Sequence, residues 1–336
     1  MRYGIVGTGS YLPSTVVSNE AIAERTGIKA SWIAERTGIH QRRFAQPDQA
    51  TSDLAGLAAQ QALAAAELPA ELLDFVILGT STPDFPQPAT AVIVQAAIGA
   101  DHAAAFDVNS VCSSFVYALD VARGLLAADE KARYALVIGA DIYSRQLDFG
   151  DHRSAVLFGD GAGAVVLGPV DGEHGMLASR LVSDGRLQDL VKVAGGGSRN
   201  PHTPSSLMTG AGYFTMQGRA VREYVETTVP DLLEGLLKES DLTLDDIDMV
   251  VPHQANAILL RNTFARAGLP LEKLHLSCGH YGNTAAASIP ITLDSVVRGQ
   301  GIDRGSLVML LGIGGGMSAG ASLHRWVGTS AGLAAA

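Results

Sequence analysis

Short, continuously apolar runs recur along the chain and predict buried β-strands. Residues 75–78 (FVIL), 135–138 (ALVI) and 307–311 (LVMLL) are three of them. Because strands that are apolar throughout are covered on both faces, these runs predict an α/β protein. Alanine-rich stretches with helical spacing separate them. One such helix is expected after Ser52, whose hydroxyl can cap it, and its apolar face carries Leu54, Leu57, Ala58 and Leu63.

An internal repeat relates two parts of the chain. Residues 73–76 (LDFV) resemble residues 247–250 (IDMV), and residues 109–120 run beside residues 283–294. Both pairs share one offset, since 248 − 74 = 174 and 283 − 109 = 174. Chance similarity in an alanine-rich chain is the alternative explanation. The repeat predicts a duplicated fold.

The two predicted halves are residues 1–170 and residues 171–336. A pseudo-twofold axis would bring equivalent loops of these halves together and form one site from residues distant in sequence. Residues 194–213, which are rich in glycine and proline, predict a long loop between the first strand and the first helix of the second half. Long loops in compact domains are often functional.

Composition narrows the class of protein. The chain is 47% hydrophobic and 17% charged, which suits a large buried core. It has no uninterrupted run of about 18 apolar residues and no signal-peptide pattern, so we expect a cytoplasmic protein without membrane insertion. Its net charge is −10, which repels phosphate backbones, and we expect no nucleic-acid partner.

The two cysteines differ in context. Cys112 lies between an apolar run at 103–108 and a helical run at 113–126, so it should sit at a helix N-terminus. The positive end of the helix dipole would lower the pKa of its thiol and make it a nucleophile. A buried cysteine that serves only as a small apolar residue is the equally weighted alternative. Cys278 has no comparable context and is expected to be structural, and neither cysteine has zinc-ligand spacing, so we expect no metal.

Two polar residues of the second half are candidates for the same site. His253 ends an apolar strand, where its imidazole would donate to a thioester oxygen, although a single histidine is more often a satisfied polar residue. Asn283 is equivalent to Asn109 and precedes a helix. It would serve either as a helix N-cap or as an amide donor to an enolate oxygen.

Glycine runs supply a further element of a site. Residues 312–316 (GIGGG) follow the last apolar strand and would let backbone N–H groups approach a ligand, as an oxyanion hole requires. Neither this run nor residues 7–10 and 159–163 match a dinucleotide-binding fingerprint, and none is followed by a Walker lysine. Nucleotide cofactor binding is therefore a weak alternative, and we expect no cofactor.

Several motifs in order resemble the β-ketoacyl-acyl-carrier-protein synthase III family of thiolase-like condensing enzymes. The resemblance extends over essentially the whole chain and implies a duplicated thiolase-like fold with five α-β-α-β-α layers. The matching segments are residues 7–13, 32–33, 36–39, the Cys112 segment, 158–164, 252–256, 282–284 and 314–316.

The resemblance also implies a reaction. Cys112 would take an acyl group from acyl-CoA, with its own N–H and that of Gly315 holding the oxyanion. His253 and Asn283 would bind a malonyl thioester and stabilise the enolate left by loss of CO₂, which then attacks the acyl-cysteine. The product would be a β-ketoacyl thioester, made in fatty acid initiation or a related secondary pathway, with coenzyme A thioesters as substrates and no cofactor.

Coenzyme A contacts follow from the same resemblance. Trp32, Arg36 and Thr37 match residues that hold the adenine end. The family's arginine partner is displaced, so His152 or Arg153 would have to stack. Gly218 and Asn256 match positions of the pantetheine channel, and Phe85 matches a residue that closes the acyl pocket across a homodimer interface.

The carrier of the malonyl group is expected to be acyl carrier protein, but the basic docking residues of the family are altered. Ile258 stands where an arginine is common, and Glu223 lies near a usual lysine. A CoA-bound extender therefore stays open. Other basic residues that would form a different rim are Arg219, Arg222, Arg261 and Arg266.

Two other functions remain as alternatives. One is acyl transfer from a thioester to an alcohol or amine of a small molecule, which Asn283 disfavours because it suits decarboxylation. The other is a non-catalytic acyl-CoA-binding protein, in which Cys112 would carry no acyl group.

Overall fold

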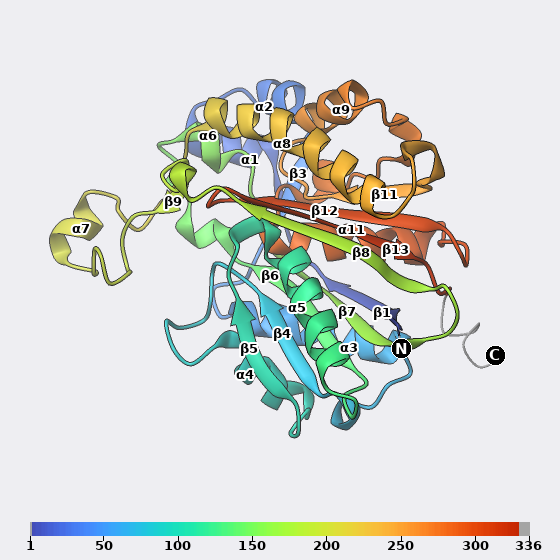
Figure 1. Cartoon of the computed structure of the whole chain (residues 1–336). Helices are drawn as coiled ribbons and strands as arrows, with labels where there is room; N and C mark the ends of the chain where they lie inside the picture. The colour runs from blue at the N-terminus through green and yellow to red at the C-terminus, as the bar shows by residue number, and fades with distance from the viewer. Residues whose placement is uncertain (1, 329–336) are drawn as a thin grey trace.

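Two β-sheets stack across the molecule in the computed structural model, which describes residues 2–328 (Figure 1). The first sheet has the strand order β1-β7-β6-β4-β5 and the second has the order β11-β12-β13-β8. The strands of the first are β1 (Arg2–Tyr11), β4 (Phe75–Gly79), β5 (Ala104–Val108), β6 (Ala135–Asp141) and β7 (Gly161–Val170). Those of the second are β8 (Gly175–Ser183), β11 (Met249–Pro252), β12 (Leu307–Gly314) and β13 (Ser318–Arg325).

Helices form three layers around these sheets. Helices α5 (Ser114–Ala128) and α11 (Ser288–Gly299) lie between the sheets and contact both of them. Helices α3 (Thr51–Ala65) and α4 (Thr90–Ile98) cover the outer face of the first sheet. Helices α8 (Gly218–Glu239) and α9 (Ala257–Arg266) cover the second (Figure 1). The layers therefore run α-β-α-β-α.

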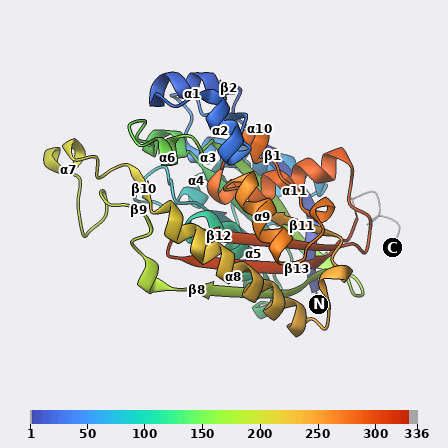
Figure 2. The same cartoon turned by 90° about the horizontal axis from the view of Figure 1, so that it is seen from above.

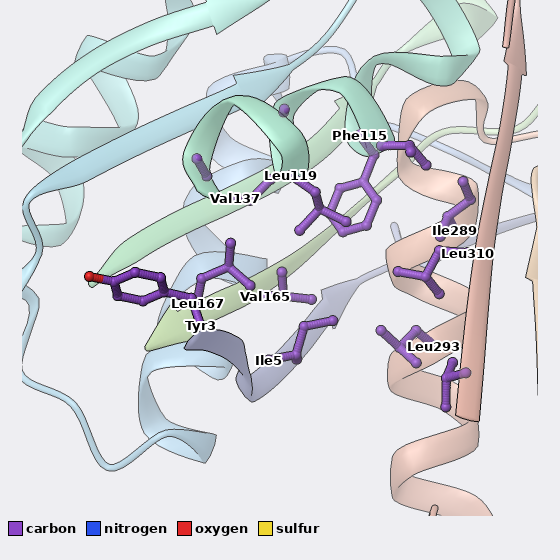
Figure 3. Packing of buried hydrophobic residues seen from close by; sticks show 14 of the residues in the cluster. Tyr3, Ile5, Phe115, Leu119, Val137, Val165, Leu167, Ile289, Leu293 and Leu310 are labelled. Carbon is purple, nitrogen blue, oxygen red and sulfur yellow. The ribbon is translucent and has the colours of Figure 1, made fainter. Parts of the chain in front are cut away.

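The middle helix layer carries the largest apolar cluster. Phe115 and Leu119 of α5 meet Ile289 and Leu293 of α11, and all four are fully buried (Figure 3). Residues from both sheets complete this cluster, including Val137, Val165, Leu167 and Leu310. Burying a side chain of this size contributes about 1.5–3 kcal/mol, so this layer holds the two halves together.

The two sheets repeat one another. Read as β8-β13-β12-β11, the second has the same order and the same strand directions as β1-β7-β6-β4. Only β5 has no counterpart, because the short helix α10 (Cys278–Tyr281) occupies the equivalent stretch. The predicted duplication is confirmed. The boundary between residues 170 and 171 falls between β7 and β8 and stays a prediction.

A small cap packs against α6 (His152–Ala155), α9 and α10. It consists of β2 (Thr15–Ser18), α1 (Asn19–Thr26), α2 (Ala30–Thr37) and β3 (Gln41–Phe44). Both helices end at a glycine with positive φ, Gly27 and Gly38, a conformation in which glycine costs least. The fully buried Arg42 ties the cap to the body, since its guanidinium donates to Asn19 Oδ1 at 2.8 Å and to the Val156 carbonyl at 2.7 Å.

Most predicted elements are present, with local differences. The three apolar runs form β4, β6 and β12. Helix α3 begins at Thr51 with Ala50 as its N-cap, and Ser52 does not cap it, because the Ser52 hydroxyl donates to Asp84 Oδ2 at 2.6 Å. Leu57 is 39% exposed and does not lie on the buried face.

The predicted loop at 194–213 stands away from the rest of the molecule in both views (Figures 1 and 2). It contains the short helix α7 (Pro204–Met208). A two-stranded ribbon of β9 (Val191–Val193) and β10 (Phe214–Met216), which the sequence did not predict, holds the base of this arm.

One stretch of the described chain, Val111–Ala128, is long and apolar enough to cross a membrane by length and composition alone. The structure gives another cause for its composition. Phe115, Leu119 and Leu126 are buried in the cluster between the two sheets. The stretch is therefore a core helix here.

Candidate active site

Cys112 lies in a tight turn between β5 and α5. The turn is a short 3₁₀ segment, Val111–Ser113, and Val111 has φ +49°. Gly314 at the end of β12 packs directly on it, because a Cβ at this position would lie 2.4 Å from the Ser110 carbonyl oxygen and 2.9 Å from the Cys112 nitrogen. Only glycine fits there, so the run at 312–316 is needed for this approach.

His253 directly follows β11. Its backbone N–H donates to the Leu311 carbonyl at 2.7 Å. Its ring Nδ1 lies 2.8 Å from Ser288 Oγ at the start of α11. The side chain is 5% exposed, and burial lowers its pKa to about 4. The imidazole is therefore neutral at pH 7.

Asn283 is held by the first half of the chain. Its N–H donates to the Leu157 carbonyl at 2.8 Å, and its own carbonyl accepts from the Gly159 N–H at 3.0 Å. The side-chain Oδ1 accepts from the Ala285 N–H at 2.9 Å. Because the amide oxygen is engaged, its NH₂ group is left to donate. The predicted role as a helix N-cap was wrong, because Thr284 and Ala287 hold the N-cap positions of the 3₁₀ segment Ala285–Ala287 and of α11. The role as an amide donor stays a prediction.

One cavity brings these three side chains together. It has a volume of about 70 Å³ and is lined by Cys112, His253 and Asn283 with Gly314 and Gly315. Among residues 2–328, the N–H groups of Cys112 and Gly315 donate to no other backbone or side-chain acceptor. A larger groove of about 500 Å³ lies along α8, but neither a cysteine nor a histidine lines it. The smaller cavity is therefore the candidate active site.

The pKa of the Cys112 thiol differs from the sequence prediction. Burial raises the pKa of the Cys112 thiol well above its usual value, and the Asp141 carboxylate adds to the effect. The thiol's own backbone N–H lowers the pKa, as expected at a helix start, but this contribution is the smallest of the three. The prediction of a lowered pKa was wrong, because desolvation outweighs the helix end.

Asp141 is the nearby buried charge. It ends β6, and its carboxylate accepts from Thr82 Oγ1 at 2.8 Å and from the N–H groups of Ser81 and Ala286, each at 2.9 Å. Burial nevertheless raises its pKa to about 6. This residue joins β6 of the first half to the turn after Asn283.

Comparisons with known proteins bear on this site. The family model "3-Oxoacyl-[acyl-carrier-protein (ACP)] synthase III" matches residues 106–185, and its C-terminal model matches residues 237–326. An acetoacetyl CoA synthase, NphT7, from Streptomyces sp. strain CL190 is 47% identical, and the match covers 97% of this chain and 99% of that one. A β-ketoacyl-[acyl-carrier-protein] synthase III from Erythrobacter litoralis is 46% identical over 97% of this chain and all of that one.

The chain belongs to the β-ketoacyl-[acyl-carrier-protein] synthase III family. It is an acyltransferase of the condensing type, and the resemblance found in the sequence is confirmed. The crystal structure of the synthase III FabH from Pseudomonas aeruginosa superimposes with a TM-score of 0.90 at 38% identity, covering 98% of this chain and 99% of that one. The predicted thiolase-like fold is therefore confirmed as well.

The sequence did not predict the aromatic wall of this synthase III site. The rings of Tyr143 and Phe158 stack with centroids 4.6 Å apart, and Phe214 meets both edge-on at 5.5 and 4.8 Å. All three are buried in one cluster with Cys112. Phe158 and Phe214 line the cavity itself. A local signal existed only for Phe158, which lies in a family motif.

The predicted coenzyme A residues lie outside this cavity. Trp32 on α2 and His152 meet edge-on, with ring centroids 6.0 Å apart. Arg153 pairs with Asp151 at 2.8 Å, and its side chain is 75% exposed. Of the two predicted stacking partners, the structure places His152 beside Trp32.

The remaining predicted contacts have structural roles in the free protein. The Thr37 hydroxyl donates to the Ile33 carbonyl at 2.6 Å and is buried. Asn256 caps α9 through Leu259 N–H at 2.9 Å and donates to the Arg36 carbonyl at 3.1 Å, so both of its polar atoms are engaged. Gly218 begins α8 and is exposed. Their contact with coenzyme A stays a prediction.

Phe85 and the predicted carrier rim are exposed. Phe85, in the loop after β4, is 56% exposed, and Ile258 on α9 is 40% exposed. Arg219 pairs with Glu223 at 3.1 Å, and Arg266 pairs with Glu226 at 3.1 Å. Within the described range, no cluster of three acidic, histidine or cysteine side chains could hold a metal ion.

Proposed function

We propose that this synthase III transfers an acyl group from acyl-CoA to Cys112 and condenses it with a malonyl thioester, releasing CO₂ and a β-ketoacyl thioester. The observation that supports this most strongly is the shared cavity of Cys112, His253 and Asn283. It joins a nucleophile to two side-chain donors from the other half of the chain. The two unengaged N–H groups supply a place for an oxyanion.

Acylation begins from a neutral thiol. The Cys112 sulfur forms a bond to the acyl carbon, the carbon–sulfur bond to coenzyme A breaks, and the thiol proton leaves with coenzyme A as its thiol. The N–H groups of Cys112 and Gly315 stabilise the oxyanion of the tetrahedral intermediate. Since the pKa of the thiol is raised, the resting enzyme keeps little thiolate exposed to side reactions.

Condensation uses the two donors. Ser288 Oγ lies 2.8 Å from both the Ala285 carbonyl and His253 Nδ1, and the proposed reaction uses the arrangement in which its proton binds Nδ1. The neutral imidazole then carries its own proton at Nε2, on the cavity side. His253 Nε2–H and the Asn283 amide bind the malonyl carbonyl oxygen and stabilise the enolate formed by loss of CO₂. The enolate carbon attacks the acyl carbon, and the Cys112 thiolate leaves and takes up one proton from solvent.

A short acyl group fits the cavity best. The free volume of about 70 Å³ is small, and the Phe158 and Phe214 rings stand beside Cys112. A longer chain would have to displace rings that are already packed against Tyr143, and close-packed interiors resist such shifts. We therefore propose an acetyl or similarly small donor.

The surface favours a malonyl group carried by coenzyme A over one on an acidic carrier protein. Two arginines of the candidate rim, Arg219 and Arg266, are paired with glutamates of α8. Ile258 on α9 is an exposed apolar side chain where the family commonly has an arginine. Ion pairing weakens the attraction of these two arginines for an acidic partner. The name of the Streptomyces relative, an acetoacetyl CoA synthase, supports the same choice.

We also propose a homodimer located in the cytoplasm. Among the described strands, β5 pairs only with β4, which leaves one edge of the first sheet unpaired. Phe85 is exposed, as are Leu207 (58%) and Met208 (89%) on the arm. An unpaired edge and exposed apolar side chains suit a second copy of the chain.

The test measures CO₂ release and β-ketoacyl product from acetyl-CoA and malonyl-CoA. The native protein should release one CO₂ per product, and Cys112→Ala and Cys112→Ser should lose at least about 10³-fold of the product rate. Cys278→Ala is the matched control, since that cysteine lies outside the cavity. Product formation in Cys112→Ala would refute the proposal. Acyl transfer to an alcohol or amine without malonyl-CoA would support the alternative acyltransferase.

A further inference from the structure

Three serine hydroxyls meet where the Cys112 turn touches the glycine turn after β12. Ser110 and Ser113 belong to the first half, and Ser318 begins β13 in the second. Ser318 Oγ lies 2.9 Å from Ser110 Oγ and 2.8 Å from Ser113 Oγ. It also donates to the Gly315 carbonyl at 2.9 Å. Ser113 and Ser318 are both buried, so water does not compete for these bonds.

The number of hydroxyl protons determines which serines can act as donors in this cluster. Each hydroxyl has one proton and two acceptor positions. Ser318 donates its proton to the Gly315 carbonyl, and its oxygen accepts the Ser110 hydroxyl proton at 2.9 Å. Ser113 Oγ lies within hydrogen-bond distance of both the Ser110 carbonyl, at 2.7 Å, and Ser318 Oγ, at 2.8 Å. The three serines thus form one connected path from the Cys112 turn to Gly315.

Gly315 needs such a restraint. It lies in a run of three glycines, 314–316, and glycine has the greatest backbone freedom of any residue. Contact with the Cys112 turn fixes Gly314 on one side. On the other side, the Ser318 hydroxyl is the side-chain group that holds the Gly315 carbonyl. With both flanking peptides fixed, the Gly315 N–H has one orientation relative to the Cys112 N–H.

We propose that Ser318 is a positioning residue for the oxyanion hole, and that it sets the separation of the Cys112 and Gly315 N–H groups through the hydroxyl cluster. The inference rests on the proposed function, because it assumes that these two N–H groups bind an oxyanion. It predicts a defect in the steps that pass through a tetrahedral intermediate on Cys112. Binding of acyl-CoA should be little affected.

The experiment compares three variants. Ser318→Ala removes the hydroxyl, and Ser318→Thr retains it. Ser322→Ala is the matched control, because Ser322 is buried on the same strand but bonds His324 at 2.9 Å and contacts neither turn. The rate of Cys112 acylation by acetyl-CoA is measured by quenched flow and intact mass, with kcat and KM for acetyl-CoA and thermal unfolding alongside.

Ser318→Ala should acylate about 10- to 100-fold more slowly than the native protein, with KM changed less than about twofold. Ser318→Thr should recover most of the rate, and Ser322→Ala should acylate normally even if its unfolding temperature falls. A native acylation rate in Ser318→Ala, or an equal loss in Ser322→Ala, would overturn the inference.

Hydrogen exchange separates this inference from the proposed function. In Ser318→Ala, amide exchange should accelerate in the peptide that covers residues 313–317 and stay unchanged in the peptide that covers β11. Should the native protein form no acyl-Cys112 at all, the proposed function fails, but the exchange measurement still decides whether Ser318 restrains Gly315. Unchanged exchange in residues 313–317 would then contradict the positioning role.

Discussion

The turn at 109–114 in the first half and the turn at 283–288 in the second have the same backbone. Val111 and Ala285 have φ values of +49° and +48°. In each turn an asparagine two residues earlier accepts this N–H on its Oδ1, Asn109 at 3.1 Å and Asn283 at 2.9 Å. The difference lies in the next residue, which is the proposed nucleophile Cys112 in one turn and Ala286 in the other.

The two turns have the same backbone, so the different roles proposed for them depend on their surroundings. Asn109 is exposed, whereas Asn283 is 4% exposed and lines the cavity. A serine follows each turn, and its hydroxyl lies on the carbonyl three residues earlier, Ser114 on Val111 at 2.6 Å and Ser288 on Ala285 at 2.8 Å. Only Ser288 also contacts a histidine. In the proposed reaction, one half supplies the nucleophile and the other supplies the donors.

The sharpest test of this division compares the two asparagines. Asn283→Ala should reduce condensation by about 10²–10³-fold, because an oxyanion donor in a buried cavity is lost. Asn109→Ala removes the same backbone contact at the surface and should keep at least about half of the activity. Steady-state product formation measures both. Equal losses in the two variants would mean that the turn, and not the amide donor, matters.

Substitution of the two equivalent serines, Ser288 and Ser114, should give a smaller difference in activity than substitution of the two asparagines. Ser288→Ala leaves His253 Nδ1 without its partner and should lower the rate of malonyl decarboxylation by about 10- to 30-fold, as expected when a catalytic imidazole loses its orienting group. Ser114→Ala loses the bond from the Ser110 N–H at 2.7 Å and should mainly lower stability. Decarboxylation assays and chemical unfolding separate the two effects. A slow Ser114→Ala enzyme of native stability would contradict the assignment.

Substitution of Phe214 in the aromatic wall should have a smaller effect, which concerns the length of the acyl chain that the enzyme accepts. Phe214→Ala should enlarge the cavity and raise kcat/KM for hexanoyl-CoA relative to acetyl-CoA by about tenfold, within the range that one or two methylene contacts supply. Ser206→Ala, a buried site on the arm away from the cavity, is the control. The ratio of the two kcat/KM values is the readout. An unchanged ratio would show that Phe214 does not limit the acyl chain.

The pH dependence of Cys112 alkylation tests whether the pKa of its thiol is raised. Because the pKa of Cys112 is raised, its thiolate fraction at pH 7 is small and grows tenfold with each pH unit, so iodoacetamide alkylation should rise steadily from pH 7 to pH 9 without a plateau. Asp141→Asn removes the nearby negative charge and should speed alkylation at pH 8 by about threefold. Cys112-specific peptide mass spectrometry follows both. A plateau below pH 8 would show a lowered pKa instead.

The repeat explains why the meeting of Cys112, His253 and Asn283 in one cavity could be predicted from the sequence. The shared offset places Cys112 and Asn283 in equivalent turns, and His253 ends the strand equivalent to β4. Other features depend on contacts that no local pattern contains. The pKa of Cys112 is raised by Asp141 from another strand, and Tyr143 and Phe214 meet Phe158 only in the folded chain. Ser52 could not be assigned correctly because its partner, Asp84, lies in a distant loop.

The most direct measurement of the central claim is intact mass spectrometry of the native protein incubated with acetyl-CoA and then with malonyl-CoA. The account predicts an acetyl mass increase that peptide mapping places on Cys112, and its loss after malonyl-CoA is added, with one β-ketoacyl product formed for each acetyl group lost. An acetyl group that never forms on Cys112, or one that stays there while product accumulates, would contradict it.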